Sequence, residues 1–185
     1  DGQAMEFLVE LDDTLIANLL ENESPERIAT VIQESSANDQ SFILSTLIDE
    51  QAQSVIELLK TEEQEEIEEL MGYPEDSAGA MMTTNVFTLY QNTTCRDALK
   101  SLQDQSEAEM VFYLYITDED DRLVGVASLR ALATTPADTI LKDIMVKRVH
   151  TVRPETDQEE VAQIVAQYNY LAVPVLDADD HLLGI

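Results

Sequence analysis

The sequence is poor in cysteine and in basic residues. Its single cysteine, Cys95, allows no intrachain disulfide and no zinc site built from several cysteines. Ten Lys and Arg stand against 38 Asp and Glu, which gives the 185 residues a formal net charge of −28. Nucleic acids and anionic membrane surfaces bind clustered basic residues, so we expect neither of them as a partner. The lone thiol suits a reducing, cytoplasmic setting.

Long hydrophobic runs are also absent. No apolar run approaches the roughly 18 residues that span a bilayer, and no signal peptide opens the chain. We therefore expect no direct membrane insertion by these residues. Apolar residues nevertheless make up 44% of the sequence, which is enough to bury hydrophobic cores.

The sequence also lacks the patterns that carry out catalysis. A P-loop, a Gly-rich dinucleotide turn and a Ser-His-Asp pattern are all missing, and His150 and His181 have no companions at metal-ligand spacing. Cys95 opens a predicted helix, a setting that can lower the pKa of a thiol, but no histidine is near it in the sequence. We interpret Cys95 as structural and predict that the protein is not an enzyme.

The acidic residues are spread unevenly along the chain. Residues 1–72 hold 19 acids and only two bases, a net charge of −17, whereas the other 113 residues hold 19 acids and eight bases, a net charge of −11. The charge per residue falls sharply after the stiff segment that contains Gly72 and Pro74. This change predicts a domain boundary there.

The first 72 residues carry apolar stripes at helical spacing. Leu8, Leu11, Leu15, Ile16 and Leu19 fall three or four residues apart, which predicts one buried helix face. Similar stripes recur roughly every 15 to 18 residues. Such short helices cannot bury their stripes alone, so we expect residues 1–72 to stack into an acidic, all-α helical superhelix.

Helix start signals accompany these stripes. Ser24 before Pro25 predicts an N-cap, and Thr61 is the predicted N-cap of a Glu-rich helix. The Glu-rich run 62–69 permits two interpretations, a solvated helix face or a cation-binding face. Charge runs usually face solvent, so we favour the first.

The second half of the sequence repeats itself. The matching positions are Met82, Val86, Thr88, Asp118, Asp121, Leu123 and Gly125 with Met145, Val149, Thr151, Asp177, Asp180, Leu182 and Gly184. This duplication predicts two α+β units, 73–138 and 139–185. Each unit has a first strand (86–89 or 149–152), a helix, and two strands joined by an acidic turn. The sequence ends where the first unit continues into a short helix after Ser128, so we expect the second unit to be incomplete.

The acidic turns 118–121 and 177–180 superficially suggest metal ligands. They lack the length and the terminal Glu of a calcium-binding loop. Hairpin-turn chemistry, in which Asp favours the turn backbone, explains them without a metal.

Three stretches of the sequence, 73–83, 125–130 and 156–162, carry a specific resemblance to known proteins. The tandem α+β units, the second ending in "PVLDADDHLLGI", resemble the CBS (cystathionine-β-synthase) domain pair. Helical repeats followed by "YPEDSAGAMMT" (73–83) and later by "TDQEEVA" (156–162) are similar to the cytosolic region of MgtE-type magnesium channels. The resemblance covers nearly the whole chain.

This resemblance implies a fold and a role. The fold is multidomain, an all-α helical-repeat N-terminal domain followed by an α+β tandem CBS pair that forms a homodimer through its helices. The role is Mg²⁺ sensing at the cytoplasmic face of the cell membrane, for a transmembrane pore domain beyond Ile185. Mg²⁺ between two acidic domains would relieve their repulsion and favour the closed state as a population shift.

The resemblance also implies metal ligands. Gly79 matches a glycine whose carbonyl can face a bridging ion, although a tight turn into the first strand explains it equally well. Glu159 matches an acid presented toward the N domain, and it also suits the first turn of a helix capped by Thr156 or Asp157. Asp39 matches an acid of the N domain itself.

The sequence departs from the family pattern beside these positions. Asn38 and Phe42 stand where further acids are frequent, and Asn169 stands where an Asp is common. Each lost carboxylate weakens a site for a hard cation. We therefore expect magnesium sensing to be weaker or rearranged in this chain.

The nucleotide cleft of CBS domains is altered as well. Tyr113, Arg130 and Tyr170 match positions that can contact ATP, although all three are also good packing residues. Ala131 stands where ribose-binding units place an Asp. We expect little or no ATP binding.

Two alternatives to the magnesium-sensing role stay open. One is an adenine-nucleotide-sensing CBS module that serves another effector, and the other is a passive dimerisation scaffold. The residues that follow Ile185 in the gene product would separate the three hypotheses, because a channel needs several apolar spans.

Overall fold

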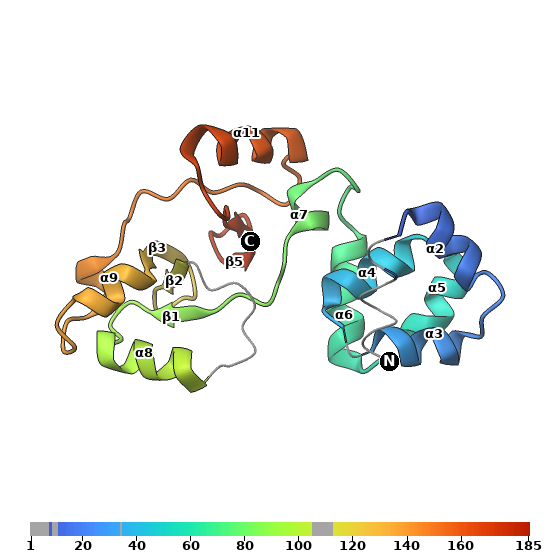
Figure 1. Cartoon of the computed structure of the whole chain (residues 1–185), viewed down its shortest axis with the longest axis horizontal. Coiled ribbons are helices and arrows are strands. Elements are labelled where there is room, and N and C mark those ends of the chain that lie inside the picture. The colour runs from blue at the N-terminus through green and yellow to red at the C-terminus, as the bar shows by residue number, and fades with distance from the viewer. Residues whose placement is uncertain (1–7, 9–10, 34, 105–112) are drawn as a thin grey trace. The chain divides into compact units, whose positions relative to one another are not determined.

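The structure, a computed structural model, describes residues 8, 11–33, 35–104 and 113–185 (Figure 1). The chain divides into two compact units, Asp1–Glu75 and Asp76–Ile185. The first unit is all-α in its described residues and the second combines helices with short strands. Within the described residues no helix is both long enough and apolar enough to cross a bilayer.

Short helices build the first unit. They are α2 (Asp13–Leu20), α3 (Pro25–Ile32), α4 (Ala37–Ser45), α5 (Asp49–Ile56) and α6 (Thr61–Met71). Helix α4 packs on α6 and α3 packs on α5. The fully buried side chains of this core come from all five helices: Ile16, Ile28, Ile32, Ile43, Leu44, Val55 and Ile67. Burying these stripes against one another stabilises helices that would be marginal alone.

The first predicted stripe is only partly buried. Ile16 and Leu20 are buried in α2, whereas Leu15 and Leu19 are 48% and 53% exposed. The prediction that Leu15 and Leu19 belong to the buried face is therefore wrong. Helix α2 begins at Asp13. Ile16 and Leu20, four residues apart, lie on its core-facing side, which places Leu15 and Leu19 on its outer side.

The helix starts follow the predicted caps with one exception. The Ser24 hydroxyl accepts a hydrogen bond from the Arg27 amide, with Pro25 at the first helical position, as predicted. Thr61 is the first residue of α6 rather than its N-cap, which is Lys60 without a capping side-chain hydrogen bond. In α6 the buried side chains include Ile67, while the glutamates at 65, 66, 68 and 69 are exposed, as expected for a solvated helix face.

A three-stranded sheet forms the centre of the first repeat. Strand β1 (Thr88–Tyr90) runs parallel to β2 (Tyr113–Thr117), which runs antiparallel to β3 (Leu123–Ser128). Around it lie α8 (Cys95–Asp104), α9 (Leu129–Thr134) and α10 (Leu141–Ile144), whereas α7 (Ala78–Met81) packs against the helix Gln158–Tyr168. Helices α8 and α9 pack together and close the core over Leu114, Ile116 and Leu132. Helix α9 is the predicted short helix after Ser128.

The second repeat reproduces this order in a reduced form. Helix α11 (Gln158–Tyr168) is followed by the antiparallel hairpin of β4 (Val175–Leu176) and β5 (Leu182–Gly184). The predicted strand at 149–152 is not formed as a strand. Only Val152 pairs, in an isolated parallel bridge to Val175, at the place that β1 occupies in the first repeat.

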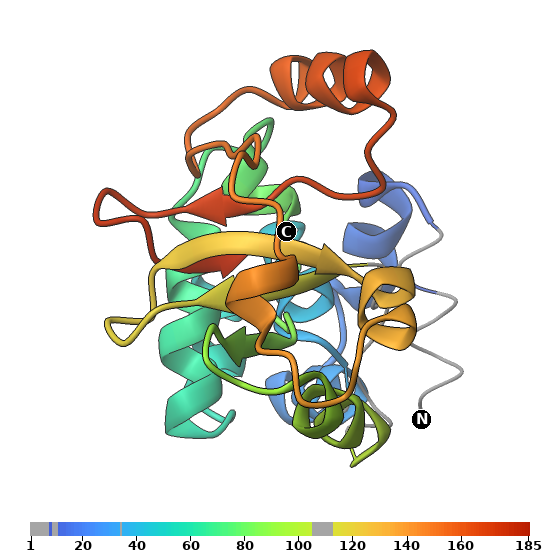
Figure 2. The same cartoon turned by 90° about the vertical axis from the view of Figure 1, so that its left-hand side faces the viewer.

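Backbone pairing joins the two repeats at a boundary that we call the seam. The paired residues are Thr83–Ile185, Val126–Val146 and Arg122–His181. Thr83 and Ile185 exchange two hydrogen bonds of 2.8 and 3.0 Å. Val126 and Val146 do the same at 3.0 and 2.8 Å. The start of each repeat thus pairs with the last strand of the other, and the hairpin turns of both repeats project on the same side (Figure 2).

The two matched glycines of the duplication lie at this seam. A Cβ atom on Gly125 would lie 2.9 Å from both the Val146 carbonyl oxygen and the Met145 sulfur. A Cβ atom on Gly184 would lie 2.6 Å from the Thr83 carbonyl oxygen. Only glycine admits so close an approach of two chains. The matched Met and Gly positions of the duplication are therefore the residues that make this contact in each repeat.

Candidate functional site

The acidic joint is held against the start of α11 by backbone hydrogen bonds. The Ala78 amide donates to the Thr156 carbonyl at 2.7 Å, and the Gly79 amide donates to the Pro154 carbonyl at 2.8 Å. The Gln158 amide donates to the Asp76 carbonyl at 2.9 Å. Two sequence motifs that lie far apart in the chain, 73–83 and 156–162, are thereby brought to one place, which we call the junction.

Side chains reinforce the junction. Gln158 Nε2 donates to Asp76 Oδ1 at 2.6 Å. Ser77 is buried, and its hydroxyl accepts from the Ala80 amide to cap α7. Asp157 caps α11 by accepting from the Glu159 amide at 2.8 Å. The junction therefore presents several carboxylates next to two helix starts, where negative charge is favoured.

The predicted metal ligands lie in different settings. Glu159 is exposed in the first turn of α11. Gly79 is buried in α7, its backbone is not left-handed, and its amide donates to the Pro154 carbonyl. Asp39 lies half-buried in the first turn of α4, in the other compact unit, and its amide donates to Ser36 Oγ at 3.2 Å. Among the described residues, no three His, Cys, Asp or Glu side chains gather in an arrangement that would hold a metal ion.

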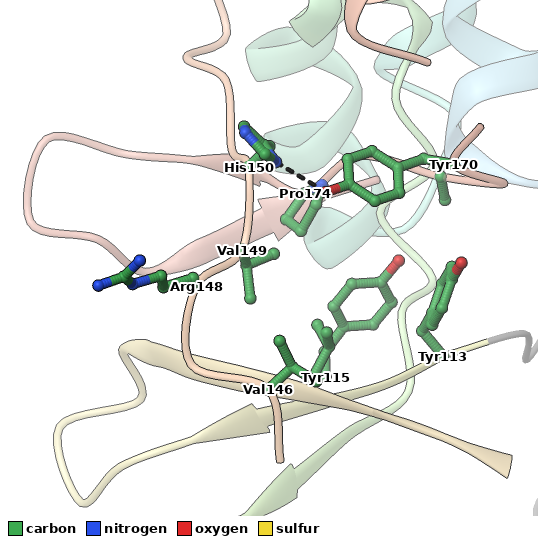
Figure 3. Close-up of a pocket in the computed structure, with 10 residues that line it drawn as sticks. Tyr113, Tyr115, Val146, Arg148, Val149, His150, Tyr170 and Pro174 are labelled. Atoms are coloured by element: carbon green, nitrogen blue, oxygen red, sulfur yellow. Dashed lines mark hydrogen bonds between the residues drawn. The ribbon is translucent and has the colours of Figure 1, made fainter. Parts of the chain in front are cut away.

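A cavity of about 180 Å³ lies between the two repeats of the second unit (Figure 3). Its lining comes from β2, β3 and the segments 146–150 and 170–174: Tyr113, Tyr115, Val126, Val146, Arg148, Val149, His150, Tyr170, Ala172 and Pro174. Tyr113 and Tyr115 rise from β2 on one side, and Arg148 lies on the other. Mostly apolar walls with a few polar tips are typical of a small-molecule site.

Aromatic rings frame one edge of this cavity. His150 Nδ1 and Tyr170 Oη are 2.7 Å apart, and the His150 ring stacks on Tyr168 with the ring centres 4.0 Å apart. Burial raises the pKa of Tyr115 to about 12, so its hydroxyl stays a neutral donor at physiological pH. Flat rings and neutral hydroxyls can stack on and hydrogen-bond a planar ligand.

The structure brings together two of the three predicted nucleotide contacts. Tyr113 and Tyr170 line the cavity, whereas Arg130 is exposed on α9 and is not among the lining residues. Arg148 and His150 supply the polar tips instead. Sequence reasoning passed over both, because Arg148 immediately precedes the predicted strand 149–152 and His150 lies within it.

Cys95 is fully buried at the start of α8. Burial raises the pKa of its thiol above the usual value, which opposes thiolate formation. The thiol contributes to the core of the first repeat, in agreement with the structural role predicted for it.

Comparison with known proteins places this architecture in a family. The family model described as the MgtE intracellular N domain matches residues 1–76. The CBS domain model matches residues 78–137 and 141–185. The chain belongs to the MgtE family. The predicted fold, an N domain of helical repeats followed by a CBS pair, is thereby confirmed, as is the prediction that this part of an MgtE protein is not an enzyme.

Named relatives are magnesium transporters. The magnesium transporter MgtE of Enterococcus faecalis is 47% identical over 126 residues, which are 68% of this chain and 28% of that protein. MgtE of Thermus thermophilus is 38% identical over 134 residues, 72% of this chain and 30% of that protein. The aligned region thus spans less than a third of the length of these relatives.

Two solved structures match nearly the whole length of this chain. The cytosolic domain of the Mg²⁺ channel MgtE in complex with ATP matches with a TM-score of 0.91 and 34% identity, over 99% of this chain and 75% of that one. The soluble part of a magnesium transporter matches with a TM-score of 0.85 and 34% identity, over 97% and 81% of the two chains. This chain therefore has the architecture of the cytosolic domain of MgtE, an intracellular N domain followed by a CBS pair.

Proposed function

We propose that the chain is the Mg²⁺-sensing regulatory region of its transporter. In this proposal residues 1–72 form the sensing N domain, and residues 73–138 and 139–185 form the CBS pair. Mg²⁺ shared between the acidic N domain and the CBS pair favours the closed state of a transmembrane pore. The supporting observation is the charge of the two parts, −17 and −11, which makes their approach unfavourable without cations.

The donor set suits Mg²⁺. Glu159 and Asp39 offer carboxylates, and the Gly79 segment offers carbonyls, which are the hard oxygen ligands that Mg²⁺ accepts beside its own waters. The hydrogen bonds of the junction fix the backbone on which Gly79 and Glu159 stand, so these ligands move as one body. Sites of few protein ligands and many waters bind weakly, which suits a sensor of cellular Mg²⁺.

The matched test uses two neighbouring glutamates of α11. Glu159→Gln removes a proposed ligand, while Glu160→Gln removes the same charge from the same helix turn. Small-angle scattering of the chain during a Mg²⁺ titration measures compaction. We expect Glu159→Gln to raise the Mg²⁺ midpoint severalfold and Glu160→Gln to leave it close to that of the wild type. Equal shifts in both variants would contradict the assignment of Glu159.

We further propose that the chain forms a homodimer through its CBS helices. Helix α11 buries none of its residues within the chain, although it carries Val161, Ile164 and Val165 at helical spacing. An apolar stripe left half-exposed is typical of an interface. A two-fold contact would use the same patch on both copies.

ATP is a second ligand to consider, because a related MgtE cytosolic domain was solved with ATP and this chain has a cavity lined by Tyr113, Tyr115 and Tyr170. The rings favour stacking of a base, but Ala131 supplies no carboxylate for a ribose. We propose that any ATP binding is weak. Calorimetry tests this, and micromolar affinity would contradict it.

A further inference from the structure

Two tyrosines of β2 face the cavity between the repeats, because a strand turns alternate side chains to opposite sides. Leu114 and Ile116 are fully buried in the core of the first repeat. Tyr113 and Tyr115, which alternate with them, line the cavity. Figure 3 shows both rings rising from β2 with their hydroxyls directed toward Tyr170 of the second repeat. The strand thereby delivers two phenol groups to the space between the repeats.

The hydroxyl of Tyr115 is buried in this cavity. Tyr115 is only 3% exposed, yet its hydroxyl forms no hydrogen bond with any other residue that the structure describes. The hydroxyl of Tyr170, by contrast, lies 2.7 Å from His150 Nδ1. Buried polar groups are almost always hydrogen-bonded, because an unmet one costs free energy. A donor that is buried, unpaired within the described chain and directed into a cavity points to an acceptor on a bound molecule.

The rest of the lining favours a flat, uncharged ring. Most of its walls are aliphatic, from Val126, Val146, Val149, Ala172 and Pro174. Among the described residues that line it none is Asp or Glu, and Arg148 is exposed to solvent. In Figure 3 the Arg148 guanidinium lies away from the hydroxyls of Tyr113 and Tyr115. A ligand that reaches these hydroxyls therefore meets aromatic and aliphatic surfaces rather than charge.

A ribose and its phosphates find few contacts here. The cavity volume of about 180 Å³ is below the roughly 300–1,000 Å³ typical of sites for drug-sized ligands, so it suits one ring system rather than a whole nucleotide. Arg130 is exposed on α9 outside the lining, and Ala131 carries no carboxylate for a ribose. The net charge of −28 also disfavours the approach of a polyphosphate. The part of a ligand that this cavity recognises is its ring.

We propose that the cavity binds an uncharged planar heterocycle that accepts a hydrogen bond from Tyr115, and that it selects such a ring over the corresponding nucleotide. Tyr115 determines this specificity, and the ring of Tyr170, held by His150, offers a face for stacking. The inference rests on the weak ATP binding proposed above and adds the class of ligand that the same cavity favours.

Titrations followed by amide NMR test the ligand class, because chemical shifts measure millimolar as well as micromolar affinities. Adenine serves as the uncharged probe and ATP as its nucleotide, both without Mg²⁺ so that chelation by ATP plays no part. We expect adenine to bind severalfold more tightly than ATP and to shift the amides of β2 and of residues 170–173. Adenine that binds no more tightly than a weakly bound ATP would overturn this inference alone, whereas micromolar ATP binding would also contradict the weak ATP binding on which it rests.

Two tyrosine variants test the role of Tyr115. Tyr115→Phe keeps the ring and removes the hydroxyl, so we expect adenine affinity to fall about tenfold. Tyr90→Phe is the matched control and should bind adenine like the wild type, because Tyr90 lies outside the lining and its hydroxyl accepts a hydrogen bond from Asn92 Nδ2.

Thermal unfolding without ligand separates binding from a structural role. Because the Tyr115 hydroxyl bonds no other described residue, ligand-free Tyr115→Phe should melt at the wild-type temperature or above it. Wild-type adenine affinity in Tyr115→Phe would overturn the assignment of Tyr115, and so would a lower melting temperature of this variant without ligand.

Discussion

Replacing Gly125 by Ala tests the seam between the repeats. The new Cβ would lie 2.9 Å from the Val146 carbonyl oxygen, closer than nonbonded carbon and oxygen normally approach. That carbonyl cannot retreat freely, because Val126 and Val146 exchange hydrogen bonds of 3.0 and 2.8 Å. Overpacking costs about 1–3 kcal/mol, and straining one hydrogen bond adds about 1 kcal/mol. We expect a loss of about 2–4 kcal/mol in the second compact unit.

Thermal unfolding followed by near-ultraviolet circular dichroism measures this loss. Five of the six tyrosines lie after residue 76 and the chain has no tryptophan, so the signal comes mainly from the second unit. At roughly 4 °C per kcal/mol for a unit of this size, the melting temperature should fall by about 8–16 °C. Gly184→Ala, with its Cβ 2.6 Å from the Thr83 carbonyl oxygen, should cost at least as much.

Gly72→Ala, followed by far-ultraviolet circular dichroism because Gly72 belongs to the first compact unit, is the control for the general effect of adding a methyl group. Gly72 has a right-handed backbone with φ −76° at the end of α6, and its nearest contact would be the Glu69 carbonyl oxygen at 3.1 Å. Replacing a glycine in such a conformation by alanine stabilises the folded state, because alanine lowers the conformational entropy of the unfolded chain. We expect a change within about 1 kcal/mol. A wild-type melting temperature for Gly125→Ala would refute the close approach at the seam.

Three further predictions concern the other sites. Ala131→Asp should raise ATP affinity about tenfold or more in calorimetry, because a charged acceptor strengthens a ribose hydrogen bond by about 1.5–3 kcal/mol; unchanged affinity would show that the cavity does not bind a ribose there. Ile164→Glu should make the chain monomeric in light scattering at salt concentrations where the wild type dimerises, whereas Gln163→Glu, a neighbouring exposed position, should not. Gln158→Ala removes the bond to Asp76 and should speed amide exchange at the junction, while leaving the rest of the second unit unchanged.

Local patterns predicted the repeats but not how they join. The duplication of Met, Asp and Gly positions predicted two similar units, and both hairpins formed where it placed them. The backbone pairing between the two repeats does not show as a periodic pattern in the sequence of either repeat alone. Residues 149–152 were predicted as a strand, but only Val152 pairs there, in a bridge to Val175 of the same repeat, while the earlier Val146 pairs with Val126 of the other repeat.

The candidate sites show the same limit. Tyr113 and Tyr170 were found because they match family motifs, whereas Arg148 and His150 reach the cavity only through the path of the chain between repeats. The apolar stripe also predicted, wrongly, that Leu15 is buried. Spacing alone does not decide which of two adjacent leucine-rich faces of a helix meets the core.

Protease protection of residues 60–80 tests the central claim most directly. This segment contains the joint between the acidic N domain and the CBS pair, and its exposure should depend on whether cations hold the two together. Millimolar Mg²⁺ should slow cleavage there strongly, while NaCl of equal ionic strength should slow it much less, because screening acts without site geometry. Equal protection by both salts would contradict specific Mg²⁺ sites and reduce the effect to relief of charge repulsion.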